Sequence, residues 1–441
     1  MLLLRGGTVF DAPPDGPLAA MPPAGVPGGH RADVLIEDGS VRRVAAELAP
    51  SDHPGARVID VSGCWVARGF VDLRAHLREP GEEHKETLET GRAAAAAGGF
   101  TAVCAMPGTT PVNDQRAVTS LIVDLAGRSP GPRIWPFGAI TKGLRGQELS
   151  DMAELAEAGC VGVTDDRHPV HSAALLRRAL EYASTFGLLL MQHCEEPALA
   201  EGPYHESPLS TRLGLRGQPR EAEDVAVARD IRLAELAGAS LHVAHVSSAG
   251  SVALLREAKA RGLPVSADVS PHHLTMTEDA LLGGARVGYD PRAKVLPPLR
   301  EARDRDSLVE GLADGTLDCV ASDHAPHTRL DKDAELDAAA FGLSSLETTV
   351  SQVLSLVRDG RLSAARAVQA LGAAPARVLG KPTGLLGQGD VTVVDPARRW
   401  TPTEESLRSK GKNTPLLGCE LEGAARLTIV GGEVVFEAKA R

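Results

Sequence analysis

The stretch WVARGFVDLRAHLREPGEEHKETLETGRAAAAAGGFTAVCAM, residues 65–106, contains the unit from which the fold is predicted. Apolar runs of strand length stand at 65–73 and 100–106, and a segment of helical period lies between them at 86–97. A strand, a helix and a second strand in this order are typical of a βα unit, in which the two strands run parallel. The stretch therefore predicts an α/β fold.

The same alternation continues along the chain. We expect further strands at 133–140, 160–164, 187–192, 240–245, 264–270 and 317–322, with helices such as 170–186, 221–237, 251–261 and 364–379 among and after them. Together with the first two, these make eight strands, the number that closes a parallel barrel. We therefore predict a (β/α)8 TIM-like barrel.

Short β-type runs flank this barrel at both chain ends. They occur at 2–4, 34–36 and 41–44, and they return at 391–394, 427–430 and 433–436. We expect a small β-sandwich module built from both termini, with its parts at 1–63 and 381–441 and the barrel at 64–380. The Pro/Gly/Ala-rich stretch 11–30 is predicted to be a surface loop.

Composition excludes several classes of function. The 441 residues are 43% hydrophobic and carry a net charge of −11 without a basic run, which argues against nucleic-acid or anionic-membrane binding. No apolar stretch approaches the roughly 20 residues of a membrane span, and the first residues lack the layout of a signal peptide. The six cysteines form no C-x-x-C pair. We therefore expect a cytoplasmic protein with reduced thiols.

Ionisable residues gather where the predicted strands end. The carboxyl ends of barrel strands face one mouth, so side chains there converge even when they are far apart in sequence. These ends carry Arg74, His76, Arg78, Asp165, Asp166, His193, His245, His272, His273, Asp323, His324 and His327. One histidine beside an apolar run is more often structural, but so many histidines and aspartates at one mouth indicate a divalent metal site.

A metal at this mouth would serve hydrolysis. Bound zinc lowers the pKa of its water to roughly 7 and polarises a carbonyl, while a nearby carboxylate moves the proton. Other catalytic patterns are missing from the sequence, which has no G-x-S-x-G elbow, no Walker phosphate loop and no G-x-G-x-x-G turn after a strand.

The motifs around these residues resemble those of one family. GFVDLRAHLREPGEEHKETLETGRAAAAAGGFTAVCAMPGTTPVND (69–114) is followed in order by TKGLRGQEL, VTDDRHPV, QHCEE, HVAHVSS, SPHHLTMTED, KVLPPLR, SDHAPH, FGLSSLET and SKGKNTP. Over about residues 57–437 the chain resembles bacterial class I dihydroorotases, members of the metal-dependent amidohydrolase superfamily. That family hydrolyses the cyclic amide of dihydroorotate reversibly to N-carbamoyl-aspartate in pyrimidine biosynthesis, usually with two zinc ions.

The resemblance implies roles for individual residues. The implied metal ligands are His76 and Asp323 on one ion, His193 and His245 on the other, and Asp166 between them. Asp323 is also the implied general acid and base. The implied substrate contacts are Arg78 and His327, which would hold the carboxylate, and Phe341 and Gly342, which would touch the ring through main-chain groups. Asp165 would support Asp166.

One departure from the family affects the metal. The family reads D-x-H-x-H-L-R after its first barrel strand, whereas this chain has Arg74 at the first histidine. A guanidinium stays protonated, offers only donors and cannot coordinate zinc. Its charge would also repel a divalent cation by several kcal/mol in a partly buried site. We therefore expect one metal position to be lost and Arg74 to pair with Asp323 or Asp166.

Further departures affect the substrate. Gly108 stands where the family motif M-P-N-T has asparagine, and Leu296 stands where K-V-N-P-P-L-R has asparagine. Each change removes an amide that would bond the substrate, and an unpaired buried polar group costs roughly 1–3 kcal/mol. Arg167 replaces the glycine after the paired aspartates and adds a cation near the mouth.

These features leave three hypotheses. In the first, which the resemblance implies, the chain is a weakly active or inactive dihydroorotase-like protein, a pseudoenzyme that acts as structural or regulatory partner of aspartate carbamoyltransferase. The resemblance also implies a homo-oligomer under any of the three. In the second, it is an active dihydroorotase with one zinc held by Asp166, His193 and His245. In the third, it hydrolyses another cyclic amide. If the surviving residues only hydrogen-bond one another, no zinc is bound.

Overall fold

The computed structural model describes residues 1–11, 28–283 and 289–439. Most of the predicted loop at 11–30 lies outside the described residues. The predicted parallel barrel is confirmed, with its strands in sequence order around the ring. They are β6 (Phe70–Ala75), β7 (Phe100–Ala105), β8 (Arg133–Gly138), β9 (Gly162–Val163), β10 (Leu189–Gln192), β13 (Leu241–Val243), β14 (Val265–Val269) and β15 (Cys319–Val320).

The ring closes just beyond its first and last strands. Ala75 forms a parallel bridge with His324, and the His76 N–H donates to the His324 carbonyl over 2.8 Å. Ser322 adds a second link, because its N–H and its hydroxyl both donate to the carboxylate of Asp72. Closure therefore brings the end of β6, which carries Arg74 and His76, beside the segment that carries Asp323.

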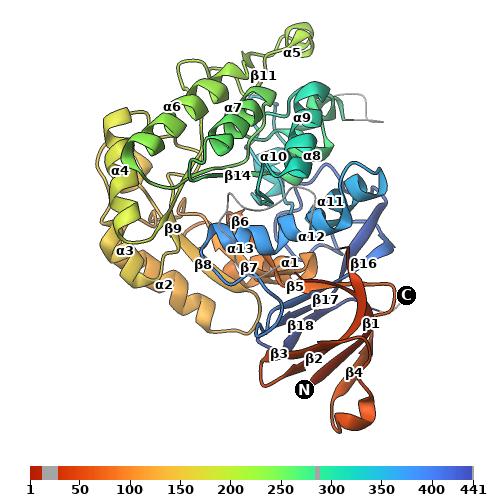
Figure 1. Cartoon of the computed structure of the whole chain (residues 1–441). Coiled ribbons are helices and arrows are strands. Elements are labelled where there is room, and N and C mark those ends of the chain that lie inside the picture. Colours follow the sequence, from red (N-terminus) through yellow and green to blue (C-terminus); the bar gives the residue numbers. More distant parts are fainter. Residues whose placement is uncertain (12–27, 284–288, 440–441) are drawn as a thin grey trace.

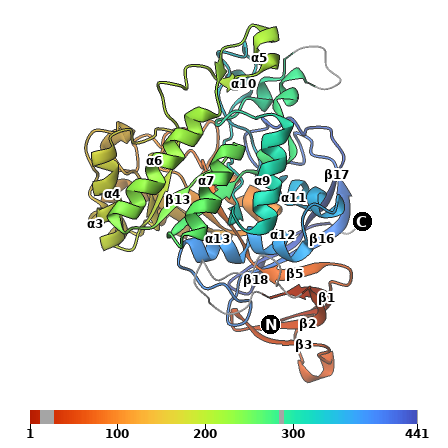
Figure 2. The same ribbon diagram turned by 45° about the horizontal axis from the view of Figure 1, so that its top comes forward.

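Helices cover the outside of the barrel, and α6, α7 and α9 lie side by side across it in Figure 2. The covering helices include α1 (Leu88–Gly98), α2 (Arg116–Gly127), α3 (Met152–Ala158), α4 (Ala173–Thr185), α6 (Glu221–Ala237), α7 (Ala249–Ala260), α9 (Ala302–Asp314), α11 (Thr349–Arg358), α12 (Ala364–Leu371) and α13 (Ala373–Val378). Apolar side chains between helices and strands form the main core. Within the described residues, no helix combines the length and the apolar character that crossing a bilayer requires.

Helix α1 illustrates how local sequence sets these boundaries. Thr87 caps its first turn, since its hydroxyl accepts the Thr90 N–H, and the hydroxyl of Thr90 accepts the Thr87 N–H in return. The helix ends at Gly99, whose φ of 90° is a left-handed conformation that glycine adopts without strain. The helix predicted at 86–97 is therefore present with its ends shifted by one or two residues.

The predicted β module from both chain ends is also present. Its mixed sheet has the order β18-β17-β16-β5-β1-β2-β3, and β4 pairs with β1. The strands are β1 (Leu2–Phe10), β2 (His30–Glu37), β3 (Ser40–Ala45), β4 (Arg57–Asp60), β5 (Trp65–Arg68), β16 (Val391–Trp400), β17 (Leu421–Val430) and β18 (Glu433–Glu437). Figure 1 shows the first and last strands, red and dark blue, together below the barrel. A separate apolar cluster forms the core of this module.

One predicted strand divides in two. The run 65–73 was expected as a single strand, but it breaks at Gly69 into β5 of the module and β6 of the barrel. The Gly69 N–H donates to the Asp390 carbonyl over 2.7 Å, and a Cβ at this position would lie 2.0 Å from the Thr101 hydroxyl oxygen. A glycine is therefore required where the chain passes from one sheet to the other.

Candidate active site

The site lies at the barrel mouth, where several residues have unusual backbone geometry. Arg78, Asp166, His245 and Asp323 have φ values of 64°, 57°, 38° and 51°. Residues other than glycine rarely adopt this left-handed backbone conformation. The backbone strain that it causes persists only where the surrounding structure imposes it. All four directly follow or closely follow barrel strands, so the backbone there is shaped to aim particular side chains.

Arg74 lies at the centre of this mouth and is only 2% exposed. Its Nε donates to Oδ1 of Asp323 over 2.8 Å, and its Nη2 lies 2.7 Å from Oδ1 of Asp166. We predicted that Arg74 would pair with Asp323 or Asp166, and it pairs with both. Two carboxylates that could hold a metal are thus joined by a guanidinium.

The two carboxyl groups titrate differently. Burial opposes ionisation of Asp166, but nearby His76, Arg74 and Arg167 outweigh it and hold the pKa of Asp166 well below its usual range. Burial raises the pKa of Asp323 to about 6, with Arg74 pulling in the opposite direction. Asp166 is therefore a permanent anion at neutral pH, whereas Asp323 is able to exchange a proton.

Deeper in the mouth, three buried histidines have unpaired ring nitrogens. Both ring nitrogens of His193, His245 and His272 lack a hydrogen-bond partner among the described residues. The rings of His193 and His245 lie 4.8 Å apart between centroids, and His272 Nε2 lies 3.7 Å from Oδ2 of Asp323. Burial lowers the pKa of His245 and of His272 well below the usual value, so both rings are neutral. Neutral imidazoles without partners are suited to bind a metal.

The two expected metal positions differ in how well their residues fit an ion. At the first position, His76 Nε2 lies 3.5 Å from Asp166 Oδ1, but Arg74 contacts both carboxylates, so a second cation does not fit. At the second, the ring nitrogens of His193 and His245 make no hydrogen bond, although His193 Nε2 lies 3.6 Å from Glu195 Oε2, and their chemistry fits one zinc ion. Asp166, the third expected ligand there, pairs with Arg74.

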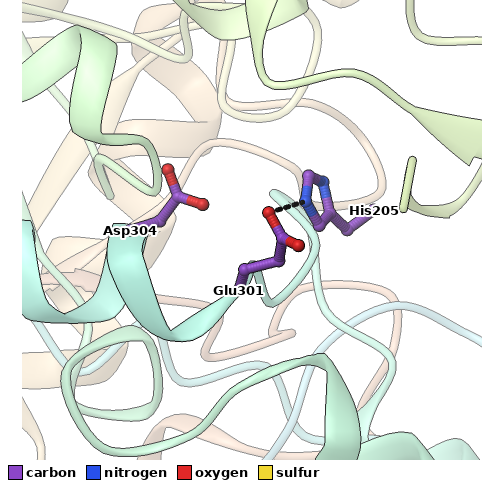
Figure 3. A group of neighbouring side chains, drawn as sticks. All are labelled: His205, Glu301 and Asp304. Atoms are coloured by element: carbon purple, nitrogen blue, oxygen red, sulfur yellow. Dashed lines mark ion pairs between the residues drawn. The ribbon is translucent and has the colours of Figure 1, made fainter. Parts of the chain in front are cut away.

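A different group meets a geometric criterion for metal binding. Within the described residues, one group of side chains has possible ligand atoms that all lie within 4.8 Å of one another. It consists of His205, Glu301 and Asp304, shown in Figure 3. Arg220 Nη2 lies 2.6 Å from Glu301, 3.2 Å from Asp304 and 3.0 Å from His205 Nε2. A guanidinium already contacts all three side chains, so this cluster is a partly buried ion-pair network.

The cavity at the mouth has a volume of about 370 Å³. Its wall includes these predicted site residues: His76, Arg78, Asp166, Asp323, His327, Phe341 and Gly342. The three departures Arg74, Gly108 and Leu296 also line it, together with Arg167. His193 and His245 are buried and are not part of the cavity wall. The structure therefore gathers the expected substrate residues around one space and places the two histidines outside its lining.

Arg78 and His327 are held together in this wall. Arg78 Nη2 lies 3.2 Å from His327 Nε2, and Arg78 Nη1 donates to Glu82 over 3.1 Å. His327 Nε2 lies 2.8 Å from the Phe341 carbonyl. Burial and the neighbouring Arg78 lower the pKa of His327 to about 3, so its ring is neutral and contributes a hydrogen bond rather than a charge.

Asp165, which was expected in a supporting role, is not part of the cavity wall. Its Oδ1 accepts the Thr141 N–H over 2.8 Å, and its Oδ2 accepts the Thr141 hydroxyl. Among the residues that were not proposed as ligands, His272 stands out, because its Nε2 lies 3.7 Å from Oδ2 of Asp323. Its only signal in the sequence is its place in PHHL, directly after the strand at 264–270.

Sequence comparisons with known proteins find dihydroorotase-like relatives. A family model described as "Dihydro-orotase-like" matches residues 63–251. A dihydroorotase of Anaeromyxobacter dehalogenans (strain 2CP-C) is 52% identical over 99% of this chain and 98% of its own length. A dihydroorotase of Trichlorobacter lovleyi is 44% identical over 99% of this chain and 100% of its own length.

Solved structures give the same fold. An L-hydantoinase (dihydropyrimidinase) from Arthrobacter aurescens superposes with a TM-score of 0.85 at 26% identity, covering 100% of this chain and 96% of that one. A dihydropyrimidinase from Brevibacillus agri gives a TM-score of 0.77 at 24% identity, over 99% of this chain and 95% of that one.

Proposed function

The chain belongs to the dihydroorotase family, and from this membership we propose that it hydrolyses dihydroorotate reversibly to N-carbamoyl-aspartate with a single zinc ion. The observation that carries the proposal is the buried pair His193 and His245, whose rings make no hydrogen bond and can each offer one nitrogen to a metal. Together with Asp166 these residues would hold the ion. Zinc bound there would activate a water and polarise the ring amide.

The chain's own residues account for the remaining steps. Arg78 provides a cationic wall for the substrate carboxylate, and neutral His327 lines the same wall with its Nε2–H held by the Phe341 carbonyl. Asp323 would accept a proton from the attacking water and deliver it to the ring nitrogen as the amide C–N bond breaks. A carboxyl group with a pKa of about 6 is mostly ionised at neutral pH yet is readily reprotonated. Arg74 occupies Oδ1 of Asp323, so Oδ2 is the oxygen that exchanges the proton.

The departures from the family limit this activity. Arg74 removes one metal position, and Gly108 and Leu296 place no amide at the cavity wall. Each lost contact to a polar ring atom weakens binding by roughly 1–3 kcal/mol, about fivefold to 150-fold in affinity. The proposed enzyme therefore has a high KM for dihydroorotate.

A second candidate function is favoured by one observation. Both carboxylates that would contact metal or substrate are already engaged by Arg74. A chain in this state would be catalytically silent and would act as a structural or regulatory partner of aspartate carbamoyltransferase. We rank it second for two reasons. The relative that is 52% identical is named a dihydroorotase, and His193 and His245 have ring nitrogens without a hydrogen bond that could bind a metal.

The test combines metal analysis with turnover. The purified chain is assayed for zinc per molecule and for interconversion of dihydroorotate and N-carbamoyl-aspartate, with hydantoin and dihydrouracil as alternative cyclic amides. One zinc per chain with dihydroorotate turnover supports the first proposal. Absence of zinc and turnover, with aspartate carbamoyltransferase co-purifying, supports the second. Preference for another cyclic amide would overturn both.

Two matched histidine variants sharpen the result. His245→Gln removes a proposed ligand and is expected to abolish zinc binding. His273→Gln changes a neighbouring buried histidine whose nitrogens already have partners, Ser270 Oγ and the Pro297 carbonyl. It is expected to lower stability while leaving the zinc content unchanged. Equal zinc loss in both variants would refute the ligand assignment.

A further inference from the structure

Two lysines lie buried beside the cavity and bind carbonyl oxygens in place of carboxylates. Lys332 is 4% exposed and Lys294 is 2% exposed. Lys332 ends the short helix α10 (Arg329–Lys332), and Lys294 directly follows the turn η5 (Pro291–Ala293). Burying an ammonium group is costly unless its donors are satisfied, so a pair of buried lysines requires an explanation.

Lys332 uses all three of its donors on main-chain oxygens. Its Nζ donates to the carbonyls of Pro291 over 3.0 Å, Lys294 over 3.2 Å and Ala340 over 2.6 Å. The first two oxygens belong to the segment 291–297, and the third belongs to the segment 336–342. The ammonium therefore links two stretches of chain that are separated by about forty residues in sequence.

Lys294 makes the reciprocal link. Its Nζ donates to the carbonyls of Leu336 over 2.7 Å and Asp337 over 3.0 Å, and it lies 4.4 Å from the centroid of the Phe341 ring. The Lys294 carbonyl also accepts the Gly342 N–H over 2.9 Å. Lys294 thus reaches from its own segment into the other, and its cation also stacks on the aromatic ring, whereas Lys332 contacts both segments from the end of α10.

Both segments form part of the cavity wall. Leu296 contributes from the first, and Phe341 and Gly342 contribute from the second. The Phe341 carbonyl lies 2.8 Å from His327 Nε2, so its position also sets that of the histidine. A shift of either segment would move main-chain groups that face the ligand, without touching Asp323 or the metal-binding histidines.

We propose that Lys294 and Lys332 are positioning residues that clamp the segments 291–297 and 336–342 together, and so fix the part of the cavity wall that grips the substrate ring. The proposal rests on the proposed function for its substrate, but the clamp itself concerns the geometry of the wall. Losing the clamp weakens substrate binding and leaves the proton-transfer group in place, so KM changes more than kcat.

The test uses Lys332→Met in the full-length chain, which keeps an unbranched apolar stem and removes the donors. Lys259→Met is the control: Lys259, in α7, donates to the Gly315 carbonyl and to Asp318, and none of these residues lines the cavity. We expect Lys332→Met to raise KM for dihydroorotate by about tenfold or more with kcat within about threefold. Lys259→Met should leave both constants unchanged.

Hydrogen exchange provides a readout that does not need turnover. In Lys332→Met, amides in 289–297 and 336–342 should exchange faster together, and those in β10 should not. In the unmodified chain, saturating N-carbamoyl-aspartate should protect both segments, which keeps the test available if the variant fails to fold. Without turnover in the parent chain the proposed function fails, and the exchange pattern still decides the clamp. Unchanged exchange in 336–342, or a fall in kcat at constant KM, overturns it.

Discussion

Replacing Arg74 by histidine should convert a site that excludes the first metal into one that depends on it. The guanidinium holds Asp166 at 2.7 Å and Asp323 at 2.8 Å, and all three side chains are buried. Removing one member of a buried ion pair leaves an uncompensated charge and costs about 3–5 kcal/mol. Since whole domains are stable by only about 5–15 kcal/mol, metal-free Arg74→His should be markedly destabilised.

Zinc should reverse this loss in the variant. The new imidazole, together with His76 and the released carboxylates, completes the ligand set that Arg74 now blocks. Free zinc at a thousand times its Kd returns about 4 kcal/mol, enough to offset most of the destabilisation. The measurements are the urea unfolding midpoint with and without zinc, zinc stoichiometry, and dihydroorotate turnover. We expect a zinc-dependent midpoint, one additional zinc per chain and increased turnover.

The control for this experiment is Arg366→His. Arg366 is another buried arginine, and it donates to the carbonyls of Leu312, Leu317 and Asp318 far from the mouth. Its variant should lose stability and regain none of it with zinc. The reasoning on Arg74 is refuted if Arg74→His is as stable as the parent without metal, or if the parent chain itself binds two zinc ions.

Three more outcomes follow from the same geometry. Gly108→Asn should lower KM for dihydroorotate by about tenfold, because it restores an amide at the cavity wall. The new side chain has room, since among the described residues only Asp166 Oδ2, at 3.5 Å, lies within 4 Å of the new Cβ. An unchanged or higher KM in steady-state assays would contradict this. Turnover should fall as pH drops through about 6, because burial raises the pKa of Asp323 to that value and the protonated carboxyl cannot accept a proton. A pH–rate profile that is flat from pH 5 to pH 7 would exclude Asp323 as the proton acceptor. Burial lowers the pKa of Lys332 from 10.5 to about 7. Between pH 7 and pH 10.5 the unfolded chain therefore binds one more proton than the folded chain. In this range the free energy of unfolding rises with pH by up to about 1.4 kcal/mol per pH unit. Chemical denaturation at several pH values should show that slope reduced in Lys332→Met.

Much of the fold could be predicted from local pattern. The helix expected at 221–237 is α6 with the same ends, and each of the eight expected strands is present. Apolar periodicity reflects burial, and burial in a βα repeat allows few topologies. The division at Gly69 was missed, because an apolar run gives no sign of which sheet each half will join. That choice depends on Asp390 and Thr101, which are distant in sequence.

The site shows the same limit. The sequence placed Arg78, His327 and Asp323 at one mouth, because strand ends converge in a barrel. It gave no indication that Lys294 and Lys332 clamp two wall segments, or that Arg220 neutralises the cluster around Glu301. Such links depend on distances between segments, which residue type and spacing do not specify.

By itself, the sequence determined the family, the barrel and the chemical character of position 74, since a guanidinium is protonated and has no lone pair for zinc wherever it stands. Only the tertiary structure decided that this charge engages Asp166 and Asp323 at once, while the ring nitrogens of His193 and His245 make no hydrogen bond. The physical reason is range: protonation at an arginine is a property of the side chain, but an ion pair requires contact within a few ångströms. Barrel closure between Ala75 and His324 brings these residues within that distance.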